Sequence, residues 1–180
     1  MVLPAGTHIF GPENARLSVR TGKTGAAARA GHNLLIEVGS WSGTVDVGEQ
    51  TTISLTADSR SLRVLDGTGG MQALGDDERA SINETIDAEV LQGTTIAFLS
   101  NEVSETADGE GLAVTGELEL NNVTGPVAFE LRPGGDGRLA AKVSFKQSDW
   151  DMKPYSALFG TLKVVDEVEV SMHGKEEASG

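Results

Sequence analysis

The three histidines are the residues of this chain best suited to metal or acid–base chemistry. They are His8, His32 and His173, and no two of them have the i, i+4 spacing that places both imidazoles of a zinc site on one helical face. The chain also has no cysteine, so it has no thiolate ligand or nucleophile. We therefore predict no metal site. His32 directly precedes an apolar stretch, where its ring is expected to bond a backbone carbonyl or a carboxylate rather than a ligand.

The remaining polar residues do not form a recognisable catalytic motif. The glycine-rich segment DGTGG at 66–70 lacks the lysine and the spacing of a phosphate-binding loop, and no G-x-S-x-G nucleophile motif occurs. Acidic residues at 76–78 suit the start of a helix, where carboxylates stabilise the helix dipole. We expect a protein that is not an enzyme and carries no cofactor.

Charge excludes several classes of partner. The chain has 14 basic and 27 acidic residues and a net charge of -13, which repels nucleic acid and anionic membranes over most of the surface. No segment has the roughly 20 apolar residues of a spanning helix, and the N-terminal residues lack the features of a signal peptide. A cytoplasmic protein without membrane insertion is expected.

Strictly alternating apolar and polar residues dominate the chain, the period of a strand with one dry face. In the clearest example one face carries Leu112, Val114, Gly116, Leu118 and Leu120. The opposite face carries an alanine, a threonine and two glutamates, at positions 113, 115, 117 and 119. Similar patterns predict strands at 15–21, 33–47, 51–58, 61–65, 94–103, 112–120, 126–132, 138–146 and 163–173. We expect an irregularity near Gly39 and Ser40, where the alternation changes register.

One segment has helical spacing instead. At 76–91, Ile82, Ile86 and Val90 recur four residues apart, so a helix with one apolar stripe is predicted there. Asp76 or Asp77 is expected to cap its start. A short helical turn is predicted at 153–159, and the segments 107–111 and 133–137 have the composition of hairpin loops.

These elements predict an all-β fold with a single domain. Consecutive antiparallel strands with short loops favour an up-and-down barrel of about eight strands, with a two-sheet sandwich as the alternative. The helix would cover one end by burying its apolar stripe. The domain is expected to span 1–174, followed by a flexible tail at 175–180.

The interior of such a barrel is either a ligand cavity or a solid core. Only eight aromatic rings occur in the chain, and the inward positions include Ala57, Gly116 and Ala141. Small residues here either leave space for a long, thin apolar ligand or let a neighbouring element approach closely. The residues alone favour neither.

Several segments, in order and spacing, resemble one family, the YceI-like proteins, in its actinobacterial form. They are GHNLLIEV at 31–38 with WSGT at 41–44, SLRV at 61–64 leading through the glycines into the helix, VTGEL at 114–118, and KPYS at 153–156 with GTLKV at 160–164. The resemblance covers about residues 7–173. It implies an extended lipocalin-like barrel that holds an amphiphilic chain, typically a polyisoprenoid.

The resemblance and the alternation together suggest a binding site for an apolar small molecule of the isoprenoid type. The inward residues expected to contact it are Leu34, Ile36, Phe98, Val114, Gly116, Leu118, Val127, Phe129, Val143 and Phe145. Polar groups expected at its mouth are His32, Asn33, Lys153 and Tyr155. Some relatives dimerise, so a homodimer is one expected assembly. Two alternatives stay open: a stress-related or scaffold protein acting through its acidic surface, and an enzyme acting on the sequestered lipid.

Overall fold

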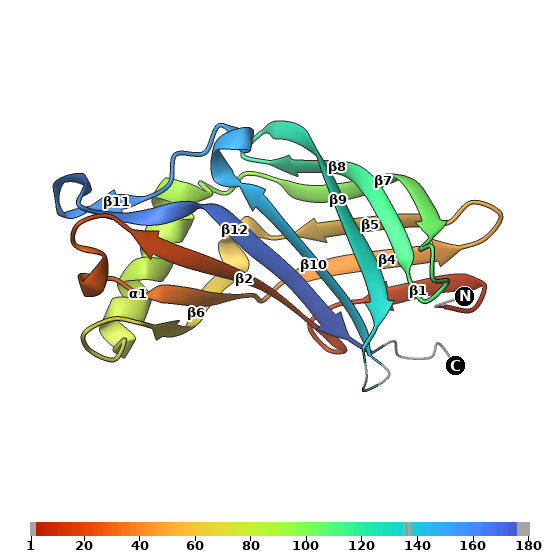
Figure 1. The fold of residues 1–180 in the computed structure, drawn as a ribbon, viewed down its shortest axis with the longest axis horizontal. Helices are drawn as coiled ribbons and strands as arrows, with labels where there is room; N and C mark the ends of the chain where they lie inside the picture. The colour runs from red at the N-terminus through yellow and green to blue at the C-terminus, as the bar shows by residue number, and fades with distance from the viewer. Residues whose placement is uncertain (1–2, 135, 137, 176–180) are drawn as a thin grey trace.

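A computed structural model describes residues 3–134, 136 and 138–175 as one curled antiparallel sheet with a helix at one end (Figure 1). The strands are β1 (Gly6–Phe10), β2 (Ala15–Thr24), β3 (Asn33–Val38), β4 (Trp41–Val47), β5 (Thr52–Ala57), β6 (Leu62–Thr68), β7 (Ile96–Glu105), β8 (Leu112–Leu120), β9 (Val123–Pro133), β10 (Leu139–Lys146), β11 (Ser156–Ala157) and β12 (Leu162–Gly174). The predicted all-β class is confirmed. Both predicted hairpin segments fall between paired strands, β7 and β8 or β9 and β10, although residues 135 and 137 of the second lie outside the described residues.

The sheet curls so that strands near its two edges come from one long hairpin, formed by residues of β3 to β6. Hydrogen-bonded neighbours follow the order β1-β4-β5-β7-β8-β9-β10-β12-β2-β3-β6. β3 continues into β4, and β5 into β6, after short interruptions. Across these interruptions the Gly39 N–H donates to the Ser61 carbonyl and the Asp58 N–H to the Ser40 carbonyl, each at 2.9 Å. The pairs β4–β5 and β3–β6, which lie near the two ends of the order, therefore form one continuous two-stranded ribbon.

The strands number twelve, more than the eight or so predicted, because long strands are divided. β1 and β2, β3 and β4, and β5 and β6 are each successive parts of one stretch, and β11 is a two-residue addition beside β12. The irregularity predicted near Gly39 and Ser40 falls at the division between β3 and β4. A separate register shift lies in the β3–β6 pair, between Leu35 and Ile36.

β1 and β11 were not predicted from the sequence. In β1 the alternation is disguised, because His8 and Phe10 are buried whereas Ile9 is 54% exposed. The helical turn predicted at 153–159 is wrong in its position. β11 occupies 156–157, and the turn follows as a 3-10 helix at Leu158–Gly160.

The helix α1 (Asp76–Thr85) continues into a π-helical turn at Ile86–Val90, which confirms the predicted helical segment. Its cap differs from the prediction. Gly75 is the N-cap residue and has no side chain to cap with, and Glu78 Oε2 instead accepts a hydrogen bond from the Gly75 N–H at 2.9 Å. Asn83 Oδ1 accepts from the Val64 N–H at 2.9 Å, which fastens the helix to β6.

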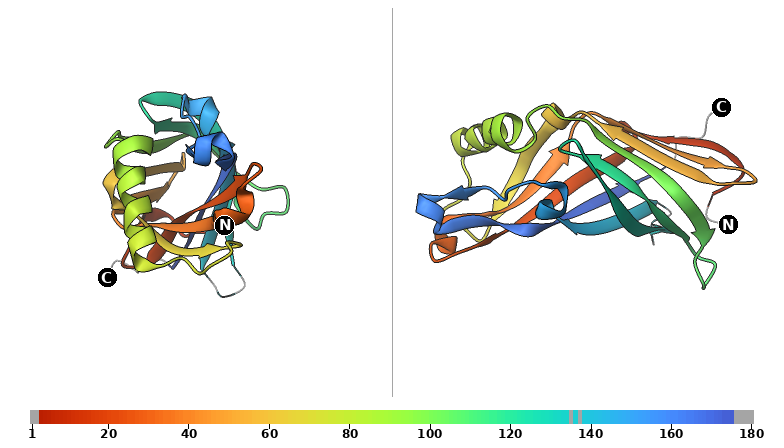
Figure 2. Two further views of the ribbon diagram at one scale, coloured as in Figure 1. Left: turned by 90° about the vertical axis from the view of Figure 1, so that its left-hand side faces the viewer. Right: turned by 90° about the horizontal axis from the view of Figure 1, so that it is seen from above.

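The interior of the curled sheet is packed differently at its two ends. Near the chain termini the interior is a solid core, whose buried residues include Leu3, Val47, Leu112, Val114 and Leu139. The opposite end carries α1 and the loops before β3 and β12 (Figure 2). Lys175, the first residue of the predicted tail, donates its N–H to the Asn14 carbonyl at 3.0 Å; the rest of that tail lies outside the described residues. In the described part of the chain, no helix is long and apolar enough to span a membrane.

Candidate ligand-binding cavity

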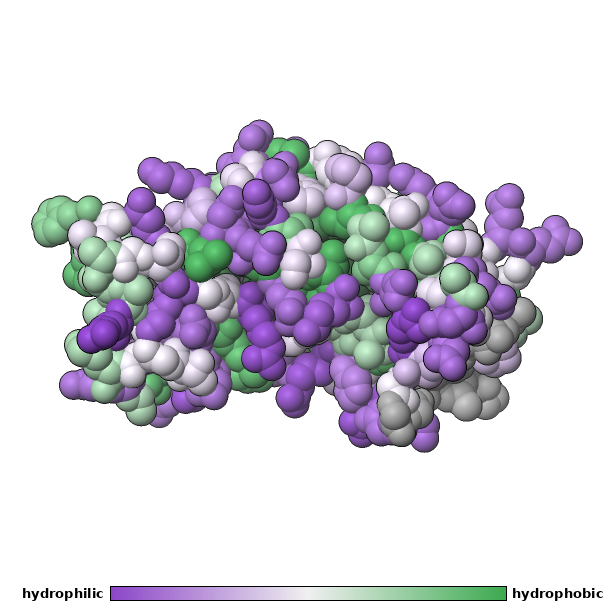
Figure 3. Space-filling model, in the orientation of Figure 1, coloured by the Kyte–Doolittle hydropathy of each residue, from purple (hydrophilic) through white to green (hydrophobic). Residues whose placement is uncertain are grey.

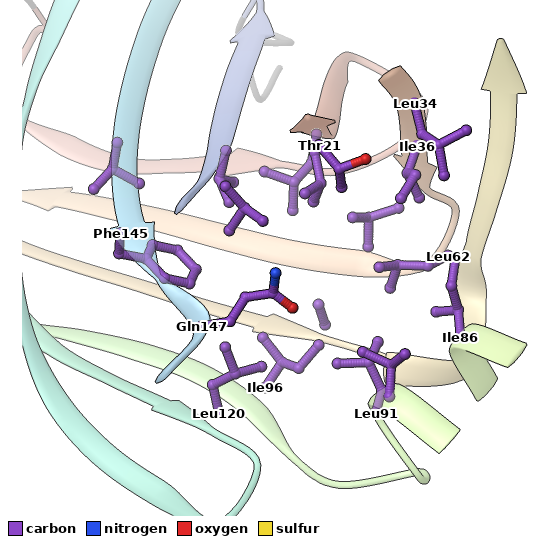
Figure 4. A pocket seen from close by; sticks show the side chains of 18 of the residues that line it. Thr21, Leu34, Ile36, Leu62, Ile86, Leu91, Ile96, Leu120, Phe145 and Gln147 are labelled. Carbon is purple, nitrogen blue, oxygen red and sulfur yellow. The ribbon is translucent and has the colours of Figure 1, made fainter. Parts of the chain in front are cut away.

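The interior opens into a cavity of about 610 Å³ that is lined mainly by apolar side chains. Its walls come from the inward faces of most strands and from the apolar stripe of the helix (Figure 4). Volumes of roughly 300–1,000 Å³ are typical of small-molecule sites. Of the two alternatives left open by the sequence, the structure has both: a solid core near the termini and a cavity beside the helix.

Most of the residues expected to contact a ligand line this cavity. They are Leu34, Ile36, Phe98, Leu118, Val127, Phe129, Val143, Phe145, His32 and Tyr155. The small residues Ala57 and Ala141 line it as well. They leave space in the cavity wall because no large neighbour fills the volume in front of them.

Four expected residues do not line the cavity. Val114 is 1% exposed and lies in the solid core. Gly116 is packed against β7, because a Cβ placed on it would lie 2.4 Å from the Leu99 carbonyl oxygen. Asn33 and Lys153 are exposed and lie outside the lining residues. The small residue at 116 therefore marks close packing of two strands.

The helix forms one wall of the cavity. Ile86 is buried, and Ile82 and Val90 are half-buried against the core, as the predicted apolar stripe requires. All three line the cavity, together with Leu91. The helix therefore covers one end of the sheet without filling the space beneath it.

Polar side chains that were not predicted to contact a ligand also line the cavity, among them Thr21 and Gln147. The hydroxyl oxygen of Thr21 is buried and has no hydrogen-bond partner among the described residues. Gln147 is 7% exposed, and its amide nitrogen donates to the Val165 carbonyl at 3.1 Å. Figure 4 shows the Gln147 amide among apolar side chains. Thr21 continues the inward alternation of Leu17 and Val19 in β2. Gln147 does the same after Val143 and Phe145 in β10. Extending the alternation by one step along each strand would therefore have predicted both positions.

At the open end, the polar side chains of His32 and Lys23 bond backbone carbonyls of neighbouring loops. His32 Nε2 lies 2.7 Å from the Gln72 carbonyl oxygen, as the favoured interpretation of this residue predicts. The Lys23 ammonium donates to the carbonyls of Gly31 and Gly69. These two side chains join the loop before β3 to the loop before the helix. Lys163 also lines the cavity and is exposed.

A tryptophan packs behind the cavity wall where the pairing of β9 with β10 ends. β9 and β10 are paired only across four positions, from Leu139 opposite Pro133 to Lys142 opposite Glu130. Beyond them Trp150 is buried, donates its ring N–H to the Leu118 carbonyl at 2.9 Å and packs on Phe145 with ring centroids 4.8 Å apart. Figure 3 shows hydrophobic surface where the two strands diverge.

Titratable side chains among the lining residues include His32, Glu78, Tyr155 and Lys163. The described residues include no cluster of three or more His, Asp or Glu side chains able to hold a metal. The groups whose pKa departs clearly from its ordinary value lie on the outside. For example, hydrogen bonds from Thr106, the Glu110 N–H and Arg132 lower the pKa of Asp108.

Solved structures share this fold at low sequence identity. The crystal structure of Burkholderia cenocepacia BcnA superposes with a TM-score of 0.62 at 15% identity, over 88% of this chain and 94% of that one. The Campylobacter jejuni YCEI protein gives a TM-score of 0.55 at 13% identity, over 80% of this chain and 85% of that one. These similarities concern the fold alone.

The amino-acid sequence itself matches one protein family. No curated protein matches the chain. The model of the YceI-like domain matches residues 12–175, which include all twelve strands except β1 and also the helix. This chain belongs to the YceI-like domain family.

Proposed function

We propose that the protein binds a long apolar amphiphile, of the polyisoprenoid kind, in the cavity between the helix and the sheet. The observation that carries the proposal is the open, apolar volume of about 610 Å³ in an otherwise well-packed molecule. Folding normally leaves few voids larger than a water molecule in an interior. A preformed apolar cavity with an open end therefore suits an apolar ligand.

The energetics favour a chain-like ligand. Each buried CH₂ group contributes about 0.8 kcal/mol, so a few isoprene-sized units outweigh the cost of association if the cavity is preformed. Thr21 and Gln147 provide a hydroxyl and an amide for one polar group of the ligand. We propose sequestration or transport without catalysis, and a cytoplasmic location.

The first experiment is solvent extraction of the protein purified from its own host, followed by mass spectrometry. We expect one class of long-chain lipid at a near-stoichiometric amount. A protein that is well folded but yields no lipid, and that takes up no apolar fluorescent probe after extraction, would contradict the proposal.

A pair of variants on β10 separates the cavity from the rest of the barrel. Ala141 lines the cavity, whereas its neighbour Ala140 does not and projects from the opposite face of the same strand. We expect Ala141→Phe to lower the bound lipid several-fold by occupying cavity volume, and Ala140→Phe to leave it unchanged. Equal lipid content in both variants would show that the lipid binds elsewhere.

A further inference from the structure

The loop between β11 and β12 exposes two large apolar side chains. Phe159 is fully exposed (107%) and Leu158 is 54% exposed. Both have left-handed backbone conformations, with φ of 55° and 51°, which bulky side chains rarely adopt. This loop protrudes at the left of Figure 1, and Figure 3 shows hydrophobic surface at its tip. Neither the exposure nor the backbone conformation is explained by packing of the fold.

Hydrogen bonds hold the loop in this shape. Leu158 accepts two at its carbonyl, from the Thr161 N–H at 3.2 Å and from the Thr161 hydroxyl at 2.6 Å. The Thr161 carbonyl in turn accepts from the Ala27 N–H at 2.8 Å, which joins the loop to the segment before β3. The phenyl ring is thus presented outward from a braced turn. Strained backbone that the surroundings maintain is a common feature of functional sites.

The charge around this loop is opposite to that of the molecule. Segments 14–36 and 152–165 contain no aspartate or glutamate, although the chain has 27 of them. The two segments lie side by side, through the β2–β12 pair and the Ala27 bond. They carry the exposed cations Arg29, Lys153 and Lys163.

Asp151 is exposed and lies two residues before Lys153, and other carboxylates at this end lie on β6 and α1. Asp66 lies in β6, and Asp76, Asp77 and Glu78 lie at the start of α1. Charges separated by more than about 8 Å are largely screened at physiological ionic strength. The two segments that carry the β11–β12 loop and its neighbours are therefore locally basic, although the molecule as a whole has a net charge of -13.

We propose that this end of the protein docks on an anionic lipid bilayer, with Phe159 and Leu158 in the headgroup region and Arg29, Lys153 and Lys163 facing lipid phosphates. Aromatic residues favour the membrane interface, and lysine or arginine beside them is attracted to anionic headgroups. The net charge of -13 repels an anionic membrane on average over the whole surface, whereas docking uses one face.

Docking places the cavity mouth against the membrane. Tyr155, Leu162 and Lys163, which flank the exposed loop, line the cavity. An amphiphile leaving the bilayer would enter between these residues and the helix. The docking itself needs no cargo, so it can be tested separately from the proposed function.

The test is co-sedimentation of lipid-free protein with vesicles of phosphatidylcholine alone or with one third phosphatidylglycerol. We expect binding to the anionic vesicles only. Phe159→Asn should reduce it about tenfold without unfolding the protein, because asparagine tolerates the left-handed conformation. The double variant Lys153→Glu, Lys163→Glu should reduce it at least as much.

Matched controls change the same chemistry elsewhere. Leu99→Asn removes another exposed apolar side chain (59%) on β7, and Lys146→Glu reverses an exposed charge on β10. Both should bind the anionic vesicles as the parent does. Absence of parent binding, or equal losses in the control and loop variants, would overturn the docking proposal. Lipid extracted from a protein that does not dock would leave the proposed cavity function standing.

Discussion

At the scale of single residues, the interior is distinguished by how little polarity it contains. Thr21 is the clearest exception, because its buried hydroxyl has no hydrogen-bond partner among the described residues. An unsatisfied buried polar group costs about 1–3 kcal/mol. Such a group is retained at a functional site when a ligand satisfies it, which motivates the following substitution.

Replacing Thr21 by valine should separate stability from binding. We expect Thr21→Val to raise the free energy of unfolding of the lipid-free protein by about 1 kcal/mol, because the unsatisfied hydroxyl is removed. Affinity for a ligand with a polar group should fall about fivefold. Chemical denaturation and ligand titration measure the two effects. Val19→Thr, on the same inward face, is the control and should destabilise. A destabilised Thr21→Val protein would contradict this role of the hydroxyl.

Asp108 should make stability depend on pH at the loop between β7 and β8. It accepts hydrogen bonds from the Thr106 hydroxyl at 2.6 Å and from Arg132 at 2.9 Å, and its pKa lies well below the ordinary 3.8. Because folding lowers this pKa, the stabilisation is complete above pH 3.8 and is lost as the pH falls further.

The measurement is denaturation of the parent and Asp108→Asn proteins across the acidic range. We expect the variant to be less stable at neutral pH and the difference to narrow below pH 3.8. Glu110→Gln removes a carboxylate from the same loop but keeps the N–H that donates to Asp108, so it serves as the control. A difference between parent and variant that does not change with pH would contradict the role of Asp108.

At the scale of elements, close approach of strands decides where the interior is solid. Gly116 in β8 lies opposite a register shift in β7, between Ser100 and Glu102. The shift brings the Leu99 carbonyl under the glycine, at 2.4 Å from the place of a Cβ. Gly43 in β4 lines the cavity and its nearest contact would be a tryptophan ring atom at 3.4 Å.

The two glycines should therefore respond differently to the same substitution. We expect Gly116→Ala to lower the free energy of unfolding by about 1–3 kcal/mol, because the added methyl group meets backbone that cannot move freely. Gly43→Ala should change it by less than about 1 kcal/mol. Urea denaturation of both variants provides the comparison. Equal effects would indicate that β7 and β8 are not as close as described.

At the scale of the whole molecule, one end supplies the stability and the other the binding volume. The solid core around Val114 and Leu139 lies near the termini, and the cavity lies beside α1. A ligand that binds only the folded state stabilises it by mass action. Filling the cavity should therefore stabilise the end that lacks a solid core.

Lipid removal should expose this division. We expect the extracted protein to lose about 2.7 kcal/mol of unfolding free energy relative to protein held at a ligand concentration one hundred times its Kd. Hydrogen exchange should accelerate mainly in the helix around Ile86, and much less in β8 around Val114. Uniform acceleration along the chain would contradict a division into a solid end and a binding end.

Local sequence patterns determined the strands, the helix and much of the cavity wall. Side chains alternate across a strand whatever its neighbours are, so Leu34, Val143 and Phe145 were placed inward correctly, and extending the same parity reaches Thr21 and Gln147. The four-residue spacing of Ile82 and Ile86 likewise located the helical face.

Only the tertiary structure decided where that interior is hollow and what its rim presents. A small inward residue leaves space at Ala141 but closes it at Gly116, because the outcome depends on how far away the neighbouring strand lies. The left-handed backbone at Leu158 and Phe159 could not be predicted from the sequence either, since neither residue type favours that conformation. Volume and strain are set by contacts between segments distant in the chain, and periodicity describes only each segment's own geometry.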